Sequence, residues 1–385
     1  MLAIGVMSGT SLDGVDVALI EIKENDCFSL VDFVSIPYDI EFKEKIKRNL
    51  SDETAKLNEI CSLNYELSYH FKDAVDVILN KNNLKYNDIS FIASHGQTIW
   101  HEPHPRPGNV ASTLQIGDGQ IISTLTGIPV VFNFRVSDIV LGGEGAPLVP
   151  MFEYLFFRSK DQNIILQNIG GIGNLTYLKK DCSVNDVLAF DTGPGNVIID
   201  YFMNKYYNLP FDDEGKIAKS GMVIIPILDK LMKDSFIKKV PPKSTGREAY
   251  SKEYLEHISS LYEFDKYNKE DIIATITEFT AMSIIYNYKT FISDFDMAIV
   301  SGGGSHNKYI MERLNEEFNH KVFTLDEKYN INGVSFSDAK EAFAFAVLGY
   351  LSLNGRCGNV RTSTGAKDDL VLGEVTLARK VEKWK

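Results

Sequence analysis

The feature that most constrains the fold of this chain is a pattern that occurs twice. Each time an apolar run leads into a loop of glycine and small polar residues, and a second apolar run follows. The first loop lies in GVMSGTSLDGVD, which begins at Gly5, and the second lies in NIILQNIGGIGNLTYL, which begins at Asn163. A hairpin needs only about two turn residues, so the surplus in the first loop indicates a loop that holds something. Two such starts predict two related lobes.

Strand-like and helix-like segments alternate over most of the 385 residues, which predicts an α/β fold. Apolar residues at three- and four-residue steps predict helical structure from about Glu41 to Lys81. A strand is expected to end at Phe190, followed by a turn that carries Asp191. We expect a bilobed chain with a central nucleotide cleft, whose lobes are residues 1–135 with about 366–385, and residues 136–365.

Composition narrows the class of partner. The formal net charge is −12, and an acidic surface repels phosphodiester backbones, so nucleic acid is not expected. No apolar run reaches the ~18 residues of a membrane helix, and no basic segment precedes the first apolar run, so neither a membrane partner nor a signal peptide is expected. Four scattered cysteines without a C-x-x-C pair fit a cytoplasmic protein.

Three loops have the character of phosphate cradles: SGTSLDG, NIGGIGN and SGGGSHN. None fits the dinucleotide fingerprint or the P-loop. Glycine lets backbone N–H groups approach an anion, and an aspartate beside such a cradle, here Asp13, is typical of Mg²⁺ binding. One such loop alone is more simply an Asp-Gly turn. Two strand–loop–strand cradles followed by strand–GGG–helix resemble the superfamily of sugar kinases, actins and heat-shock chaperone ATPases.

Two carboxylates are candidates for catalysis. Asp191 in FDTGPGN is expected at the carboxyl end of a strand, where ligands bind in open α/β sheets, and a carboxylate there suits a general base. The alternative interpretation is a cap for the helix expected near Asn196. Glu341 shares a face with Asp338 on a helix expected from Ser337, and an acidic first turn stabilised by the helix dipole explains this pair equally well.

Nine stretches together identify a family. They are GVMSGTSLDGVD, SHGQT, GGEGAPLVP, NIGGIGNLT, FDTGPGN, PPKSTGRE, SGGGSHN, DAKEAFAFA and STGA. In this order they resemble the anhydro-N-acetylmuramic acid kinase family over essentially the full length. The resemblance implies a sugar-kinase/actin-like (ribonuclease H-like) fold, usually a homodimer. It also implies transfer of the γ-phosphate of ATP to O6 of 1,6-anhydro-N-acetylmuramic acid while water opens the anhydro bridge at C1, in peptidoglycan recycling.

The resemblance also implies roles for individual residues. Asp191 would deprotonate the attacking water, Glu341 would assist near the anomeric centre, and Arg135 would face the lactyl carboxylate. Mg²⁺ would bind at Asp13. The residues expected to bind ATP are Gly9, Thr10, Ser11, Leu12, Asp13, Gly14, Val15, Asp16, Gly170, Gly171, Gly173, Asn174, Gly302, Gly303 and Gly304. The residues expected to bind the sugar are His95, Gln97, Arg135, Gly195 and Asn196.

The chain departs from the family pattern at two positions. Asn133 stands where the family commonly has aspartate before the arginine, and Glu144 stands where it commonly has glutamine. Both flank the expected sugar pocket. Two alternatives stay open from the residues: a nucleotide-driven switch without a sugar substrate, as in chaperones and filaments, and a kinase for a different amino sugar.

Overall fold

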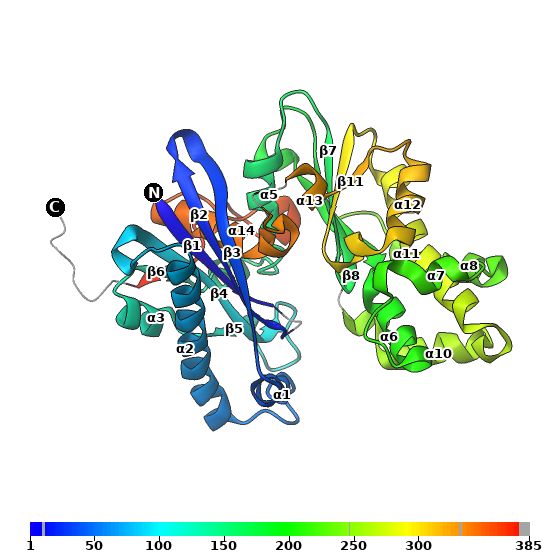
Figure 1. The fold of residues 1–385 in the computed structure, drawn as a ribbon, viewed down its shortest axis with the longest axis horizontal. Coiled ribbons are helices and arrows are strands. Elements are labelled where there is room, and N and C mark those ends of the chain that lie inside the picture. Colours follow the sequence, from blue (N-terminus) through cyan, green and yellow to red (C-terminus); the bar gives the residue numbers. More distant parts are fainter. Residues whose placement is uncertain (10–11, 246, 330, 332, 377–385) are drawn as a thin grey trace. The chain divides into compact units, whose positions relative to one another are not determined.

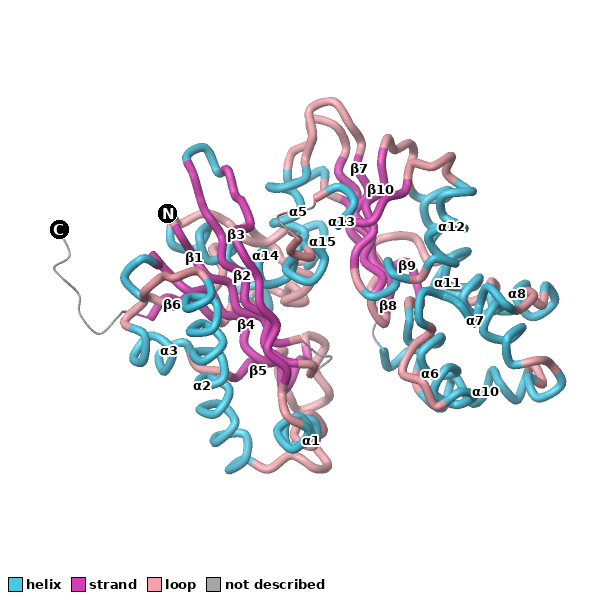
Figure 2. The backbone as a smooth tube through the Cα atoms, viewed as in Figure 1, coloured by secondary structure: helices cyan, strands magenta, loops and turns pink. Residues whose placement is uncertain are grey.

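The computed structural model of the chain describes residues 1–9, 12–245, 247–329, 331 and 333–376. The fold consists of two compact units (Figures 1 and 2). The first comprises Met1–Phe156 and Asn330–Lys385, and the second comprises Phe157–Tyr329. Each unit has its own β-sheet flanked by helices. The predicted α/β class and two-part organisation are therefore confirmed.

The sheet of the first unit has the strand order β12-β6-β4-β1-β2-β3 in the described residues, and β5 pairs with β4. Strand β2 runs antiparallel to its neighbours β1 and β3, whereas β4 is parallel to β1, and β6 is parallel to β4. The strands are β1 (Leu2–Ser8), β2 (Gly14–Lys23), β3 (Cys27–Pro37), β4 (Ile89–Glu102), β5 (Ser112–Ile116), β6 (Val130–Phe132) and β12 (Glu374–Thr376).

Two long helices, α2 (Leu57–Lys81) and α14 (Phe336–Leu353), cover this sheet. Alternate residues of β1 point to opposite faces: Ile4 packs in a cluster with Phe71 of α2, whereas Gly5 faces Ala342 of α14. A Cβ at Gly5 would overlap the Ala342 carbonyl oxygen, so only glycine allows the helix to approach this closely. The remaining helices are α1 (Ile40–Lys47), α3 (Gly119–Thr126), α4 (Val136–Val140), α5 (Val149–Phe157) and α15 (Arg361–Thr364).

The packing of α14 on β1, β2 and β4 explains which residues belong to the first unit. The expected division gave residues 136–156 and 330–365 to the second lobe, whereas they belong to the first unit. The reason is that α14 covers one face of the first sheet although it follows the second unit in sequence. The helical structure predicted from about Glu41 to Lys81 is present as two helices, α1 and α2, separated by residues 48–56.

The sheet of the second unit repeats this topology. Its order in the described residues is β11-β10-β7-β8-β9. Strands β7, β8 and β9 run antiparallel, β10 is parallel to β7, and β11 is parallel to β10. The repeat predicted from the two glycine-rich hairpins is thus present as five strands in the same order and direction. The strands are β7 (Ile164–Ile169), β8 (Ile172–Leu178), β9 (Leu188–Pro194), β10 (Met297–Ser301) and β11 (Val322–Thr324).

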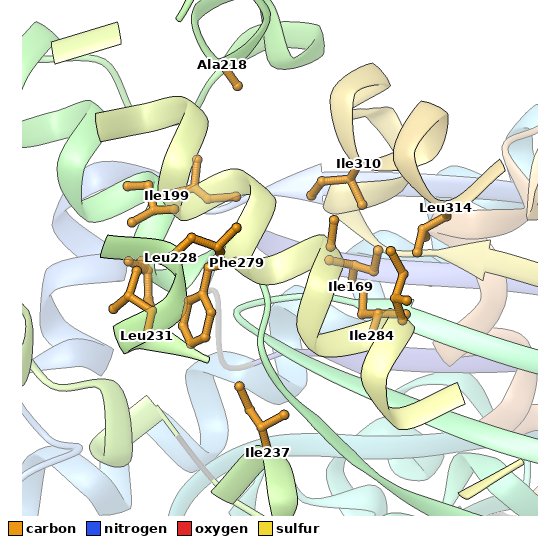
Figure 3. Packing of buried hydrophobic residues seen from close by; sticks show 14 of the residues in the cluster. Ile169, Ile199, Ala218, Leu228, Leu231, Ile237, Phe279, Ile284, Ile310 and Leu314 are labelled. Carbon is orange, nitrogen blue, oxygen red and sulfur yellow. The ribbon is translucent and has the colours of Figure 1, made fainter. Parts of the chain in front are cut away.

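Helix α11 (Lys269–Phe291) runs through the core of the second unit, where Phe279 and Ile284 are fully buried. Figure 3 shows these side chains in one cluster with Ile169 of β7 and Ile310 of α12. The other helices are α6 (Asn196–Tyr207), α7 (Lys216–Ser220), α8 (Ile225–Leu231), α9 (Ser235–Lys238), α10 (Lys252–Leu261), α12 (Lys308–Glu317) and α13 (Leu325–Lys328).

Short 3₁₀ turns link several of these elements. They are η1 (Glu24–Asp26), η2 (Tyr86–Asp88), η3 (Val184–Asp186), η4 (Asp213–Gly215), η5 (Arg247–Tyr250), η6 (Phe264–Lys266) and η7 (Gly303–His306). Within the described part of the chain, no helix combines the length and the apolar character that a membrane crossing requires.

Candidate active site

Asp191 lies inside β9, three residues before its end, and not in a turn as expected. Strand β9 is the edge of its sheet and carries a bulge at this point: Asn174 of β8 pairs with Asp191, but Gly173 pairs with Gly193. Thr192 is therefore the extra residue, and Gly193 has a φ of 131°. Bulges change the direction of side chains and are common beside active sites. Strand β9 therefore bends at the bulge and continues to Pro194, where the sequence predicted a turn.

The backbone of a neighbouring segment holds Asp191 in place. The Thr245 N–H donates a hydrogen bond to Asp191 Oδ2 at 2.7 Å, and the Asp191 N–H donates to the Lys243 carbonyl at 3.1 Å. The N–H groups at the N-terminus of α6 do not need Asp191 as an acceptor, because those of Gly195 and Asn196 donate to the carbonyls of the β7–β8 hairpin. Asp191 is therefore not the cap of this helix, and the alternative interpretation is excluded.

That hairpin contains the second glycine-rich loop. Gly170 and Gly171 supply the carbonyls that receive the α6 N–H groups, at 2.8–3.2 Å. A Cβ at Gly195 would overlap the Gly170 carbonyl oxygen, and a Cβ at Gly173 would lie 2.6 Å from Thr192 Oγ1. These glycines thus bring the hairpin, the bulge and the helix start close together. Asn174, the strand partner of Asp191, accepts a hydrogen bond on its carbonyl from Gln167.

The third glycine loop packs against the same hairpin. A Cβ at Gly302 or Gly304 would clash with Ile169 or its neighbour Asn168, whereas Gly303 has open space except for Asn196. Gly303 and Asn196 line a cavity of about 970 Å³. Helix α12 does not begin directly after the GGG triplet: the turn η7 comes first, and the helix begins at Lys308. Asn307 caps it by accepting the Tyr309 and Ile310 N–H groups. Other lining residues are Ile199, Phe211, Met311, Asn315, His320 and Phe323.

In the first unit, Glu341 lies on α14 between Lys340 and Ala342, and Ala342 lies against Gly5. Lys340 forms a buried ion pair with Glu153 of α5 at 2.5 Å, which fixes this turn of the helix. The Glu341 side chain reaches solvent, yet desolvation by surrounding protein raises the pKa of its carboxyl. The negative charge of Asp16 acts in the same direction. Glu341 is thus biased toward its protonated form.

Arg135 lies close enough to Glu341 for their charges to interact. Its Nε and Nη2 donate to His95 Nε2 at 3.1 and 2.9 Å, and its Nη1 donates to the Gly145 carbonyl at 2.8 Å. A guanidinium only donates, so His95 Nε2 is the acceptor and Nδ1 carries the proton that binds the Gly96 carbonyl. Burial lowers the pKa of His95 to about 3, so the imidazole is neutral and orients the guanidinium.

The first glycine loop is supported from beneath by a buried network. Ser8 at the end of β1 donates to Gln97 Oε1 at 2.6 Å and hydrogen-bonds the Tyr38 hydroxyl at 2.8 Å. Gln97 is fully buried and His95 is only 4% exposed. Both side chains therefore support other groups in this structure, and their expected contacts with the sugar stay a prediction.

Part of the loop itself is described. The Leu12 N–H donates to the Gly9 carbonyl at 3.2 Å, and Leu12 has a φ of 59°. A Cβ at Gly14 would overlap the Ile36 carbonyl oxygen, and Val15 is buried. Thr10 and Ser11 lie outside the described residues.

Two aspartates flank this loop. Asp13 is exposed and pairs with Lys43 at 2.9 Å. Burial is the main cause that raises the pKa of Asp16, and the nearby charges of Asp338 and Asp13 raise it further. In the described ranges no group of three or more Asp, Glu, His or Cys side chains is arranged to hold a metal. Mg²⁺ does not need a site built by protein alone, because it usually binds one or two carboxylates together with substrate phosphates. Asp13 and Asp16 fit a Mg²⁺ site of this kind.

The two unusual positions have different partners. Asn133, with a φ of 56°, donates a hydrogen bond to Glu374 of β12. Glu144 contacts His104 at 3.2 Å. The hydrogen bonds of Arg135 go instead to His95 and to the Gly145 carbonyl.

Comparison with known proteins identifies the family. The family model described as anhydro-N-acetylmuramic acid kinase matches residues 1–378. The chain belongs to this family. A relative with this description from Clostridioides difficile is 44% identical over 98% of both chains, and one from Francisella tularensis subsp. novicida is 42% identical over 97% of both. A solved structure, the activator of the 2-hydroxyisocaproyl-CoA dehydratase from Clostridium difficile with bound ADPNP, is 12% identical, covers 90% of this chain and 94% of its own, and has a TM-score of 0.44.

Membership in the anhydro-N-acetylmuramic acid kinase family confirms the predicted enzyme class, a phosphotransferase that uses ATP and a small sugar substrate. It also confirms the predicted function in amino-sugar metabolism and peptidoglycan recycling.

Sequence reasoning missed three residues that position the site. Thr245 and Lys243 hold Asp191, and the only signal was their place in PPKSTGRE. Asp138 is fully buried and accepts hydrogen bonds from the Gly145 N–H at 2.8 Å and the Thr364 hydroxyl at 2.8 Å. It thereby ties the GGEGAPL loop, which supports Arg135, to the STGA segment. The signal for Asp138 was absent, because it stands outside every glycine-rich motif.

Proposed function

We propose that this chain performs the two coupled steps of the family reaction with Asp191 as the general base for water. The water oxygen bonds to C1 of 1,6-anhydro-N-acetylmuramic acid, its proton goes to Asp191, and the C1–O6 bond breaks. O6 then bonds to the γ-phosphorus, whose bond to the ADP oxygen breaks. The products are N-acetylmuramic acid 6-phosphate and ADP.

The observation that carries this proposal is the bulge at Thr192 with the Thr245 hydrogen bond. Together they fix a carboxylate at the glycine-loop end of an edge strand, with one oxygen oriented by a backbone donor. A base for an attacking water has to be positioned before its pKa matters. Preorganised geometry of this kind contributes much of an enzyme's acceleration.

On the first unit, we propose that Arg135 binds the lactyl carboxylate of the sugar and that Glu341 acts near C1. The support for Arg135 is its fixed position: three of its donors are held by His95 and Gly145. Burial lowers its pKa to about 10, so the guanidinium remains charged at neutral pH. The raised pKa of Glu341 suits a group that exchanges a proton during ring opening.

For the nucleotide, we propose that the Gly9–Asp16 loop binds phosphates and that the cavity beside Gly303 receives the nucleoside. The cavity of about 970 Å³ lies in the usual range of ligand sites. We propose Asp13 as the protein ligand of Mg²⁺, with its Lys43 pair exchanged on binding. Bound Mg²⁺ would neutralise charge on the phosphates.

We also propose a homodimeric, cytoplasmic enzyme. The four cysteines are all free thiols, which fits a reducing compartment. Light scattering of the purified chain measures the assembly, and a mass of one chain would contradict the dimer.

Reaction in ¹⁸O-water tests the coupled chemistry. We expect ¹⁸O in the anomeric hydroxyl of the product and none in the transferred phosphate, because O6 is the nucleophile at phosphorus. The label has to be measured early, since a reducing sugar exchanges its anomeric oxygen with solvent. Label in the phosphate would mean that water attacks phosphorus, which would support the nucleotide switch instead.

A further inference from the structure

Lys243 is a buried cation beside the candidate base, and the function proposed above gives it no role. Its residue is only 4% exposed. The ammonium lies over three phenylalanine rings, with Nζ 5.6 Å from the centroid of Phe190, 5.2 Å from that of Phe236 and 5.1 Å from that of Phe291. These rings come from β9, α9 and the end of α11, so the cation joins three elements.

The polar partners of the ammonium are backbone carbonyls. Lys243 Nζ donates to the Ile237 carbonyl at 2.8 Å and to the Phe236 carbonyl at 3.3 Å, both in α9. Among the described residues, no carboxylate lies within ion-pair distance of it. A buried charge without a direct counter-ion is costly, whereas methionine would fill the same space without that cost. Lysine at this position therefore calls for an explanation beyond packing.

The backbone of the same residue connects this cation to the site. The Lys243 carbonyl accepts the Asp191 N–H, and two residues later the Thr245 N–H donates to Asp191 Oδ2. Residues 243–245 thus form a strap along the free edge of β9, and the Lys243 side chain fastens one end of the strap to α9. Phe190, whose ring contacts the ammonium, is the residue immediately before Asp191.

We propose that Lys243 is a positioning residue for Asp191: its anchored ammonium holds the strap that orients the carboxylate, and its charge favours the ionised base. This inference rests on the proposed function of Asp191. The electrostatic partners of the ammonium are Asp191 and Asp234, which stabilise it, and Lys239, which opposes it. Burial lowers the pKa of Lys243 to about 8, so the group still carries its charge at neutral pH.

The test compares Lys243→Met with wild type in the full-length enzyme. We expect kcat to fall by ~10–100-fold, since a small misplacement of a catalytic group costs up to about 10²-fold. KM for ATP should stay unchanged, because the nucleotide cavity does not include Lys243. The acid limb of kcat/KM against pH should move to higher pH, because a nearby positive charge is lost. Lys243→Arg, which keeps the charge, should keep the acid limb in place.

The acid limb separates this role from a structural one. Removal of the ammonium leaves the Phe236 and Ile237 carbonyls without this donor, so a purely structural role predicts a lower melting temperature and a lower kcat with an unmoved acid limb, whereas the proposed role predicts a lower kcat with a moved acid limb. The control is Lys321→Met, which removes an exposed ammonium that donates to the Phe295 carbonyl at 3.0 Å and lies 5.7 Å from the centroid of the Phe295 ring. Lys321 immediately precedes β11, at the opposite edge of the sheet from β9. The pH profile of this variant should match wild type.

If Lys243→Met does not fold, Phe291→Leu removes one ring and keeps the lysine, and we expect a smaller loss of kcat. A kcat within twofold of wild type, or a loss of kcat with an unmoved acid limb and a lower melting temperature, would overturn the inference. Asp191→Asn distinguishes a failure of the proposed role of Asp191 from a failure of the proposed role of Lys243. If Asp191→Asn keeps turnover, the proposed function of Asp191 is wrong, whatever the result for Lys243→Met.

Discussion

The third strands of the two repeats, β3 and β9, differ in where their bulges lie. Both are edge strands and both end in proline, at Pro37 and Pro194. In β9 the bulged residue is Thr192, next to the glycine loop. In β3 the register shifts at Val31, toward the opposite end of the strand. The loop end of β3 is therefore regular, and the loop end of β9 is not.

The carboxylate also changes strands between the repeats. In the first unit Asp16 of β2 pairs with Ser35 of β3, and in the second unit Asn174 of β8 pairs with Asp191 of β9. The same topology thus places a polar pair at the loop end of each sheet, and of the two third strands, β9 has its bulge and its bonds to residues 243–245 at that end, whereas β3 has its bulge toward the other end. The shared topology explains why both pairs lie beside a glycine-rich loop, and the bulge in β9 distinguishes the surroundings of Asp191 from those of Asp16.

The largest effect is expected from Asp191→Asn. Loss of a general base costs ~10²–10⁴-fold in turnover, while ATP binding should remain, because Asp191 does not line the cavity that we propose for the nucleoside. Steady-state kinetics and calorimetric ATP titration measure the two. Asp229→Asn, an exposed carboxylate on α8 of the same unit, is the control. Turnover within tenfold of wild type would remove Asp191 from the role of base.

Arg135→Met tests the charged group of the first unit. Hydrogen bonds to charged groups contribute about 1.5–3 kcal/mol, so KM for the sugar should rise by ~10–100-fold while KM for ATP changes little. Arg135→Lys should restore only part, because an ammonium lacks the planar fork. Equal effects on both substrates would contradict a sugar-specific role.

Gly193→Ala tests the bulge itself. With a φ of 131°, a side chain here is strained by about 1–3 kcal/mol, so the melting temperature and kcat should both fall. The comparison is Val31→Ala at the bulge of β3, where we expect little change in kcat. If Val31→Ala lowers kcat as much as Gly193→Ala does, the position of the bulge beside Asp191 has no special importance.

Asp13→Ala is expected to have a moderate effect. If Asp13 binds Mg²⁺, the variant should need a several-fold higher Mg²⁺ concentration for half-maximal rate, with sugar binding unchanged. Lys43→Met, which removes the partner of Asp13, should have the opposite effect or none. A lost sugar site with unchanged dependence on Mg²⁺ would contradict the assignment.

The smallest effect concerns Glu341 and pH. Its pKa is raised in the folded state, so its contribution to stability is present below its unfolded pKa and lost as pH rises through the folded pKa. Glu341→Gln should therefore melt higher than wild type at pH 7, and the difference should vanish as pH falls toward 4.5. Glu53→Gln, at an exposed position, should show no such trend. A constant difference across pH would contradict the raised pKa.

Local patterns predicted the repeated hairpins, the start of α6 at Asn196 and the candidate carboxylates, because each depends on residues near in sequence. The bulge at Thr192 depends on pairing with β8, which no local pattern shows. The Thr245 donor lies 54 residues from Asp191, and its contact depends on the packing of α9. The hydrogen bonds that Arg135 donates to His95 join side chains 40 residues apart, so they depend on the folded sheet, and contact of His95 with the sugar stays a prediction.

The close approach of Gly5 to Ala342 has a consequence for how the chain is made. The second unit is one continuous stretch, whereas the first needs α14, which is synthesised only after the second unit. At ~5–20 residues per second, the roughly 250 residues from the end of β4 to the end of α14 take about 13–50 s, and during this time one face of the N-terminal strands stays uncovered. Helix α14 can then pack directly on the backbone of Gly5, because glycine has no side chain in the way. A newborn chain therefore completes its second unit first, and Glu341 reaches its place only after that unit has been synthesised.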